Sequence, residues 1–231
     1  MADVRVAFFD FDGTLSRGDS ILPFLLWCIR RREAPVSQLF RAAGGWLKQR
    51  RDPGKTVRAK EITLSFLTGR SRRELERLAD RFWQERLVKG LFPEGLERMR
   101  QLKAQGFTIV IVSASPSCYM DRLPGYLPAD AVLCTDCHIG ADGRFDGHVG
   151  ANCKGDEKPK RIRRWLLQKG LPESLEDCQA YGDSPSDAPM LAMVGHPVAV
   201  NPHRRLTEAV PGAEIVHWRA GGSKTQRSAE A

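Results

Sequence analysis

The chain has 231 residues, of which 42% are hydrophobic and 28% charged, and its formal net charge is +8. This is ordinary for one globular domain, or for a core domain with an insertion, and long enough to bury a core. The longest apolar run, Ile21 to Cys28, falls far short of the about 20 residues that cross a bilayer, which excludes an integral membrane protein. The first residues do not resemble a secretory signal, so we expect a cytoplasmic protein.

Six cysteines do not make a disulfide scaffold, and in a reducing compartment we expect free thiols. One cluster, Cys134, Cys137 and His138 followed by Cys153, has spacing that can hold zinc. A structural zinc site usually shows two paired knuckles, and the second pair is missing here. Zinc is therefore the less favoured interpretation of this cluster.

The positive charge belongs to one segment. Residues 17–92 contain 18 Lys and Arg against 8 Asp and Glu, whereas the rest of the chain contains 18 against 20. Such a surplus attracts anions, such as a phosphorylated metabolite, an anionic membrane or a nucleic acid, although solvated helix faces give the same pattern. Since no nucleic-acid-binding motif accompanies the charge, no nucleic-acid partner is expected.

The first elements in chain order are a strand and a helical insert. Residues 4–9 are β-branched and aromatic, which predicts a short buried strand. From about residue 20 to 88, apolar residues recur at three- and four-residue spacing, which predicts helices. Breaks near residues 33–35, 51–54 and 68–71 divide this segment.

After residue 93 the pattern alternates between helix and strand. Helices are expected at 94–105, 159–169 and about 186–193, and strands at 108–113, 131–134, 178–182, 197–200 and 214–217. This predicts an α/β fold, a Rossmann-like, mainly parallel sheet with helices on both faces and ligands at the carboxyl ends of the strands. We expect a core domain of residues 1–16 and 93–218, an inserted helical domain of residues 17–92, and a disordered tail at 219–231.

Four polar features follow expected strands or open an expected helix. They are Asp10-Phe11-Asp12-Gly13-Thr14, Ser113, Lys158, and the segment from Gly182 to Asp187. Carboxylates that meet at one point repel one another unless a cation joins them, and oxygen ligands without His or Cys favour Mg²⁺. A magnesium site with one lysine and one hydroxyl suits a phosphoryl group, so the pattern predicts phosphoryl transfer.

These motifs resemble the haloacid dehalogenase (HAD) superfamily. The resemblance rests on D-F-D-G-T at residues 10–14, Ser113 after an apolar strand, Lys158, and G-D-S-x-x-D at Asp183 and Asp187, and it covers about residues 4–202. The place of the helical insert resembles a C1 cap. The stretches N-C-K-G-D-E-K and D-G-R-F-D-G look like those of the phosphoserine-phosphatase-like, subclass IB hydrolases.

The resemblance implies a role for each matching residue. Asp10 would be the nucleophile that forms an aspartyl-phosphate, and Asp12 would protonate the leaving alkoxide and then activate water. Mg²⁺ would be held by Asp10, Asp183 and the backbone carbonyl of Asp12, with Asp187 ordering the metal site or Lys158. Further residues would bind the phosphoryl oxygens: Ser113, Lys158, Gly13 and Thr14.

Several of these assignments have alternatives. Ser115 and Ser117 lie near Ser113, and any of the three could cap the next helix. Lys154 competes with Lys158, which opens the expected helix and matches the family pattern. Asp187 could be an acidic residue favoured in the first turn of a helix. We favour Ser113 and Lys158.

The cap residues bear on the substrate. Asp19 occupies the spacing at which phosphoserine phosphatases carry an amine-reading glutamate, although it could equally cap the helix that begins near Ser20. Arg17, Arg58 and Lys60 could attract a second anionic group. The apolar stretch from Ile21 to Trp27 is expected in the cap core, and a lipid-facing surface is the less favoured alternative.

The resulting prediction is a Mg²⁺-dependent phosphomonoester hydrolase that acts through an aspartyl-phosphate on a small organic phosphate, with amine-bearing phosphates among the candidate substrates. The alternatives are a lipid phosphatase of the phosphatidylglycerophosphate type, a phosphotransferase, and a non-catalytic anion-binding protein. The expected partner is a small-molecule phosphate ester, and peripheral membrane contact is expected less.

Overall fold

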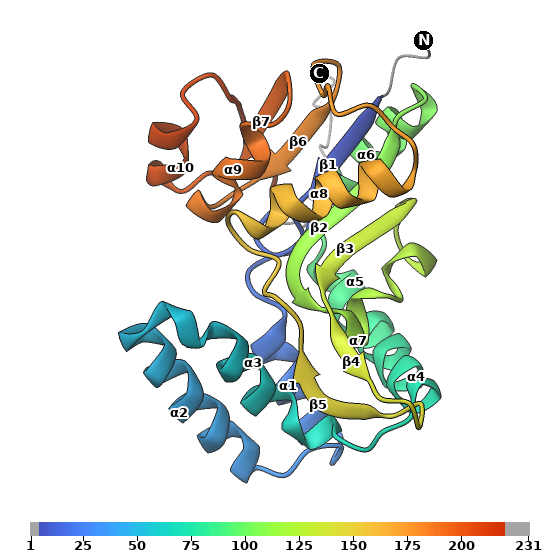
Figure 1. The fold of residues 1–231 in the computed structure, drawn as a ribbon, viewed down its shortest axis with the longest axis vertical. Coiled ribbons are helices and arrows are strands. Elements are labelled where there is room, and N and C mark those ends of the chain that lie inside the picture. The colour runs from blue at the N-terminus through green and yellow to red at the C-terminus, as the bar shows by residue number, and fades with distance from the viewer. Residues whose placement is uncertain (1–4, 220–231) are drawn as a thin grey trace, which may run out of the picture.

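The fold is built around a six-stranded parallel sheet (Figure 1). The computed structural model describes residues 5–219. The strands, in their order across the sheet, are β3 (Ala131–Thr135), β2 (Thr108–Pro116), β1 (Val6–Phe9), β6 (Gln179–Gly182), β7 (His196–Val200) and β8 (Glu214–Val216). Every neighbouring pair is parallel, which confirms the expected α/β architecture.

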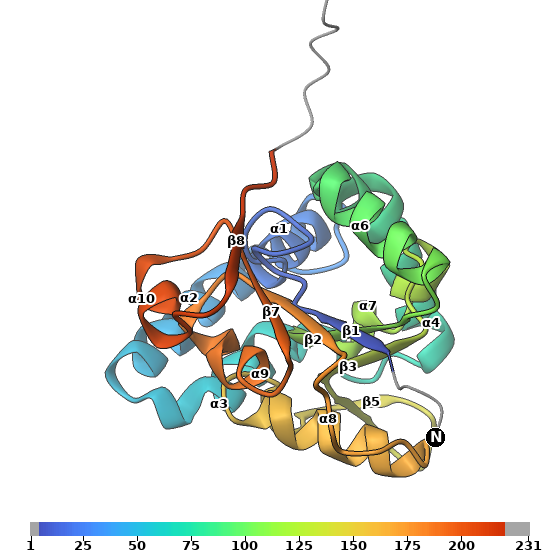
Figure 2. The ribbon, with the colours of Figure 1, turned by 90° about the horizontal axis from the view of Figure 1, so that it is seen from above.

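Alternate residues of β1 show how the sheet is buried on both faces. Val6 and Phe8 belong to one apolar core, and Ala7 and Phe9 to the other, because successive side chains of a strand point to opposite faces. The first core lies under α8 (Glu157–Gln168), α9 (Ala188–Leu191) and α10 (Arg204–Ala209). The second lies under α6 (Pro93–Ala104), and Figure 2 shows α8 and α6 on opposite sides of the strands.

The insert after β1 is helical, as its apolar spacing predicts. It contains α1 (Ile21–Arg30), α2 (Ser37–Arg51), α3 (Thr56–Leu64), α4 (Arg72–Phe82) and α5 (Val88–Gly90). Shorter helical turns lie at Pro53–Lys55, Ser65–Leu67 and Trp83–Leu87. In the apolar stretch of α1, Ile21, Phe24, Leu25, Trp27 and Cys28 are buried. Most of that stretch is therefore core.

A hairpin and the helix α10 were not expected from the sequence. The hairpin is antiparallel, consists of β4 (Cys137–Ile139) and β5 (Phe145–Val149), and follows β3. It packs against the helical insert, where the Gly69 amide donates to the Phe145 carbonyl at 2.8 Å and the Phe145 amide donates to the Arg70 carbonyl at 2.9 Å. Strand β5 contains Asp146 and Gly147, residue types that are depleted in strands, so its sequence does not indicate one. The hairpin thus lies beside the insert, although its sequence falls in the expected core segment.

The helical insert and the sheet are packed together. One apolar cluster contains Phe9 of β1, Phe24 of α1 and Phe82 of α4, and it also includes Tyr119 of the short helix α7 (Ser117–Met120). None of the helices between residues 5 and 219 has the length and apolarity that a bilayer crossing requires. The tail expected at 219–231 lies, beyond Arg219, outside the described residues.

Candidate active site

The site forms where the strand order changes direction. Strand β1 lies between β2 and β6, with Phe9 in register with both Ile111 and Tyr181. The carboxyl ends of three strands therefore meet at one edge, the usual place for a ligand in an open α/β sheet. Asp10 follows β1, and its amide donates to the Tyr181 carbonyl at 2.9 Å.

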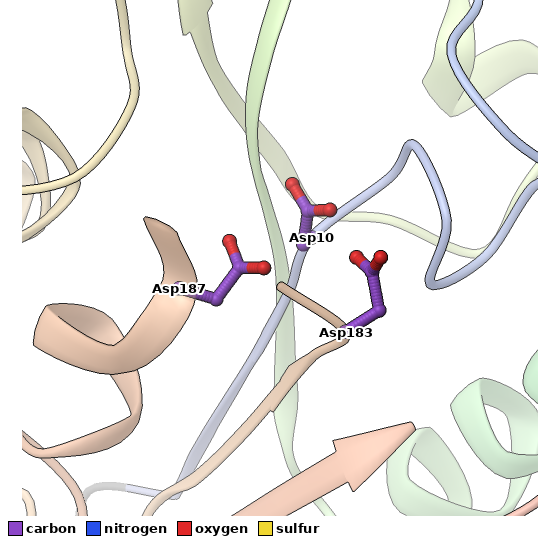
Figure 3. Close-up of side chains that lie close together, drawn as sticks. All are labelled: Asp10, Asp183 and Asp187. Carbon is purple, nitrogen blue, oxygen red and sulfur yellow. The ribbon is translucent and has the colours of Figure 1, made fainter. Parts of the chain in front are cut away.

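Three carboxylates come together at this edge. Asp10, Asp183 and Asp187 each offer an oxygen, and these oxygens all lie within 4.8 Å of one another. Figure 3 shows the three side chains converging from the end of β1 and from the segment after β6. No His or Cys is part of this group in the described chain, so the donors are hard oxygens, which suit a divalent cation such as Mg²⁺.

Lys158 on α8 neutralises part of this charge. Its side chain is only 1% exposed, and Nζ lies 2.6 Å from Oδ1 of Asp10 and 2.6 Å from Oδ1 of Asp187. Although burial alone would lower the pKa of Lys158, the two carboxylates raise it, so the ammonium form is retained. Burial raises the pKa of Asp10 well above its ordinary value despite this ion pair.

Asp187 is held by further bonds. Its second oxygen, Oδ2, accepts from the Ser184 amide at 3.0 Å and from the Ser184 hydroxyl at 2.8 Å. Burial opposes ionisation, but Lys158 and Ser184 together keep the pKa of Asp187 below its ordinary value. Both oxygens are therefore engaged by the protein, and Asp187 lies in a 3-10 turn (Pro185–Asp187), ahead of α9 and not within the expected longer helix.

Asp183 is less enclosed. The Thr14 hydroxyl donates to its Oδ1 at 3.1 Å. Burial, followed by repulsion from Asp187, raises the pKa of Asp183 to about 6. Because the carboxylates of Asp10, Asp183 and Asp187 repel one another, a bound cation would lower the free energy needed to ionise all three.

Gly13 allows the turn after β1 to lie close to Asp183, which follows β6. Its φ is +87°, a conformation that side-chain-bearing residues rarely adopt, and a Cβ on it would lie 2.4 Å from Oδ2 of Asp183. The turn after β1 can therefore reach Asp183 only with glycine at this position. This explains physically why a glycine follows the two aspartates.

Asp12 belongs to a hydroxyl network. The Ser115 hydroxyl donates to its Oδ2, and Ser115 lies 2.8 Å from the Ser20 hydroxyl and 3.1 Å from the Tyr119 hydroxyl. The other oxygen, Oδ1, is buried and has no hydrogen-bond partner within residues 5–219. Burial, with repulsion from Asp19, raises the pKa of Asp12 to about 7, so a protonated fraction persists near neutral pH.

Sequence reasoning did not assign Ser115 to the site. Ser113 is fully buried, and its hydroxyl accepts from the Ser115 amide at 3.0 Å, whereas Ser115 reaches Asp12. Ser113 and Ser115 are two residues apart in β2, so their side chains lie on the same face of the strand. Alternation along the strand puts both serines on one face, and it therefore does not indicate which of them contacts Asp12.

Two neighbouring cavities open at the cluster. One of about 210 Å³ is lined by Asp10, Asp12, Lys158 and Asp183 among others, and one of about 380 Å³ extends towards the helical insert. The two share Asp12, Asp19, Ala114 and Lys154. A larger cavity of about 610 Å³ lies beside α6 and contains none of these groups, so size does not locate the site.

Of the residues expected to contact the substrate, some line the two cavities and others do not. Asp19 lines both cavities, and its Oδ1 also accepts from the Ile21 amide at 2.9 Å at the start of α1. Lys60 is buried, and its ammonium donates to the Ala114 carbonyl and, at 2.5 Å, to Asn152. Arg17 is exposed, and Arg58 pairs with Glu61 at 3.0 Å, and neither lines these two cavities.

The two competing lysines are clearly separated. Lys158 is the one bonded to Asp10, whereas Lys154 is exposed at the rim that the two cavities share. The cysteines expected to be free are free, and the cysteine cluster near residue 137 does not form a metal-ligand group among the described residues. His138 instead lies 2.5 Å from Asp146.

Known proteins similar to the chain were found by sequence and by structure. The sequence model of the haloacid dehalogenase-like hydrolase family matches residues 7–192. Two proteins of Mycobacterium tuberculosis (strain ATCC 25618 / H37Rv) are each 29% identical to the chain. The probable phosphatase Rv3661 aligns over 87% of this chain and 70% of its own length, and the phosphoserine phosphatase SerB1 over 87% and 66%.

A solved structure extends the similarity to the fold. The protein of unknown function from Bordetella pertussis Tohama I superimposes with a TM-score of 0.81 at 26% identity. The match covers 92% of this chain and 98% of that one. The arrangement of sheet and helices around the carboxylate cluster therefore recurs in a second protein over nearly the whole chain.

Proposed function

Because the chain belongs to the haloacid dehalogenase-like hydrolase family and is a phosphatase of that family, we propose that it is a Mg²⁺-dependent phosphomonoesterase acting through an aspartyl-phosphate. The single observation that carries the proposal is the convergence of Asp10, Asp183 and Asp187 around Lys158. Buried carboxylates of this kind, beside one fixed ammonium, suit a phosphoryl group and a divalent cation together.

The donor set fits magnesium. Asp10 and Asp183 would hold the ion together with the backbone carbonyl of Asp12, because both oxygens of Asp187 already accept from Lys158 and Ser184. Asp187 would then act as a positioning residue that orients Lys158. When bound, the ion would supply charge neutralisation for the carboxylates and for the phosphoryl oxygens.

In the first half of the reaction, a carboxylate oxygen of Asp10 attacks phosphorus, and the bond from phosphorus to the leaving oxygen breaks. Asp12 donates its proton to that oxygen, so the product leaves as an alcohol. The raised pKa of Asp12 is consistent with this role. Lys158 and the Ser113 hydroxyl would contact the phosphoryl oxygens, with the turn at Gly13 and Thr14 shaping the same space.

In the second half, water attacks phosphorus and the bond from Asp10 to phosphorus breaks. Asp12, now ionised, accepts the proton from the water, which returns both aspartates to their starting states and releases phosphate. Ser115 keeps the Asp12 carboxylate oriented between the two steps through its hydroxyl bond. No external acceptor is required other than water.

The substrate we propose is a small organic phosphate that carries an amine. Asp19 supports this, because its carboxylate lies on both the phosphate-side cavity and the neighbouring 380 Å³ cavity. An ammonium in that second cavity would face Asp19, and Lys154 at the shared rim would favour an additional anionic group. Arg17 and Arg58 would not contact the substrate, because both are exposed and neither lines the two cavities.

The test of the reaction is phosphate release from an aryl phosphate by the purified chain. Asp10→Asn should abolish release, while the matched control Asp177→Asn, at an exposed aspartate remote from the cluster, should retain it. EDTA should stop the wild type, and added Mg²⁺ should restore it. Release by Asp10→Asn, or activity that resists EDTA, would refute the mechanism.

The substrate class is tested separately. Phosphoserine and phosphoethanolamine should be turned over with a higher kcat/KM than phosphate esters of similar size without an amine. Asp19→Asn should remove that preference. Because Asp19 also raises the pKa of Asp12, turnover of the aryl phosphate should be compared at a pH below the alkaline limb of each protein, where it should be largely unchanged. If the amine-free esters are equally good substrates for the wild type, Asp19 serves as the α1 cap alone.

A further inference from the structure

Helix α2 carries an exposed apolar stripe. Val36, which caps the helix, and Phe40, Ala43 and Leu47 are spaced at i, i+4, i+7 and i+11, so they fall within about 60° of one another around the helix axis. Exposed fractions are 62% for Val36, 74% for Phe40 and 54% for Leu47. We call these four residues the α2 outer face.

The opposite side of the same helix is buried. Gln38 and Ala42 are at most 2% exposed, and Gly45 is also buried. This side packs against α3, and Figure 1 shows α2 at the outer edge of the molecule with α3 on its inner side. Because the helix already buries one face, the α2 outer face is not needed for the fold of the described chain.

Cations border the α2 outer face on both sides. Arg41 and Lys48 follow one flank of the stripe, and Arg50 follows the other. The helix from Ser37 to Arg51 contains four Arg and Lys and no Asp or Glu. Among the residues that the structure describes, none of the three flanking cations forms an ion pair, although neighbouring Lys55 and Arg58 do.

We propose that the α2 outer face docks on an anionic lipid bilayer. An aromatic and aliphatic stripe between cationic flanks is the pattern of helices that lie in the membrane interface. The apolar residues would enter the acyl boundary, while the cations would pair with anionic headgroups. This places the contact on α2, whereas the sequence had suggested α1 as the less favoured membrane surface, and most of that stretch is buried.

Other occupants fit the charge less well. A second copy of the chain packed on this face would bring two cationic helices together without any acidic residue on either. A nucleic acid would match the cations but not the apolar stripe, because its interfaces are mostly polar. The bilayer alone complements both parts of the pattern.

Docking would have a consequence for access to the site. Trp46 and Gln49 lie on the inner side of α2 and line the 380 Å³ cavity. The cavity would therefore be held within about one helix diameter, roughly 10 Å, of the lipid surface. The docking proposal does not depend on the proposed reaction.

The experiment measures binding of the full chain to vesicles by co-sedimentation. Vesicles of phosphatidylcholine with phosphatidylglycerol should bind the chain, and vesicles of phosphatidylcholine alone should bind it much less. Binding should weaken with salt, because the Debye length falls from about 10 Å at 0.1 M to about 3 Å at 1 M. Arg41→Gln with Lys48→Gln should weaken binding by about fivefold per charge.

The apolar contribution has a matched control. Phe40→Asp should weaken binding at least about tenfold, the effect of keeping one large apolar side chain out of the bilayer. Leu167→Asp changes a leucine that is 79% exposed on α8, and it should have no effect. Both variants should retain the far-UV circular dichroism and the aryl phosphatase activity of the wild type, which checks folding.

Three outcomes would overturn the proposal. One is an absence of binding to the anionic vesicles, which would leave an acidic protein surface as the partner to consider. Another is equal weakening by Phe40→Asp and Leu167→Asp. The third is a dimer, measured by sedimentation velocity without lipid, that Phe40→Asp dissociates, because the α2 outer face would then be covered by a second copy.

Discussion

Replacing Lys158 by methionine tests how the acidic cluster is held in the folded protein. The side chain is 1% exposed and lies 2.6 Å from both Asp10 and Asp187, whose side chains are also at most 9% exposed. Methionine preserves the approximate length of the chain but leaves the carboxylates without a cation. Removing one partner from a buried ion pair costs about 3–5 kcal/mol, so the free energy of unfolding in metal-free buffer at neutral pH should fall by that amount.

The assay is urea unfolding followed by tryptophan fluorescence. The matched control is Lys160→Met on the same helix, since Lys160 is 67% exposed and lies 3.9 Å from Glu157. An exposed pair of this kind contributes little, and the control should change the free energy of unfolding by less than about 0.5 kcal/mol. A second variant that combines Lys158→Met with Asp187→Asn should recover part of the loss, because one repelling charge is removed.

The sign of the pH dependence follows from the carboxylates. Without Lys158 their pKa values in the folded state lie higher, so the folded protein binds protons that the unfolded chain releases. The stability of Lys158→Met should therefore be greatest at low pH and decline as the pH rises towards neutrality, and Mg²⁺ should reduce the decline. The electrostatic reasoning would be refuted if Lys158→Met lost no more free energy of unfolding than Lys160→Met, or if its loss did not depend on pH or on Mg²⁺.

Three further predictions concern the residues around the cluster. Gly13→Ala and Gly106→Ala both place alanine at a positive φ, which should cost about 1 kcal/mol of unfolding free energy in each. Only the Cβ at residue 13 also clashes with Asp183, so Gly13→Ala should lose more unfolding free energy than Gly106→Ala and should lose phosphatase activity. Burial lowers the pKa of Lys60 from 10.5 to about 8, so the unfolded chain holds a proton that the folded protein has lost between pH 8 and pH 10.5. The free energy of unfolding of the wild type should therefore rise by about 3 kcal/mol over that range. Urea titrations of Lys60→Met should show no such rise. Ser115→Ala removes a bond that lowers the pKa of Asp12, so the alkaline limb of kcat/KM should move to higher pH, and an unmoved limb would contradict the proton-donor role.

Much of the candidate site could be predicted from the sequence because its residues follow strands. Asp10 comes directly after β1 and Asp183 directly after β6, and parallel strands bring such positions to one edge whatever the loops between them. The choice of Lys158 over Lys154 as the residue that contacts Asp10 could also be argued from its place at the start of α8.

Contacts between segments far apart in the chain could not be predicted. Alternation along β2 puts Ser113 and Ser115 on one face, so it does not indicate that Ser115 is the serine that contacts Asp12. The hairpin of β4 and β5 was not predicted because β5 contains Asp146 and Gly147, which are unfavourable in strands, and is stabilised by Gly69 and Arg70 of a distant segment. Both features arise from long-range contacts that leave little periodicity in the local sequence.

The order of apolar and turn-forming residues was enough to determine the alternating strands and helices, the helical insert and the edge of the sheet where acidic side chains gather, because each depends on local spacing. Only the tertiary structure decided which cations stay free. Lys158 and Lys60 are both enclosed by oxygen atoms of distant residues, whereas Arg41 and Lys48, beside an exposed apolar stripe, form no ion pair with any residue from 5 to 219. Burial and ion pairing depend on neighbours far apart in the chain, so they cannot be predicted from the number of charges in a segment.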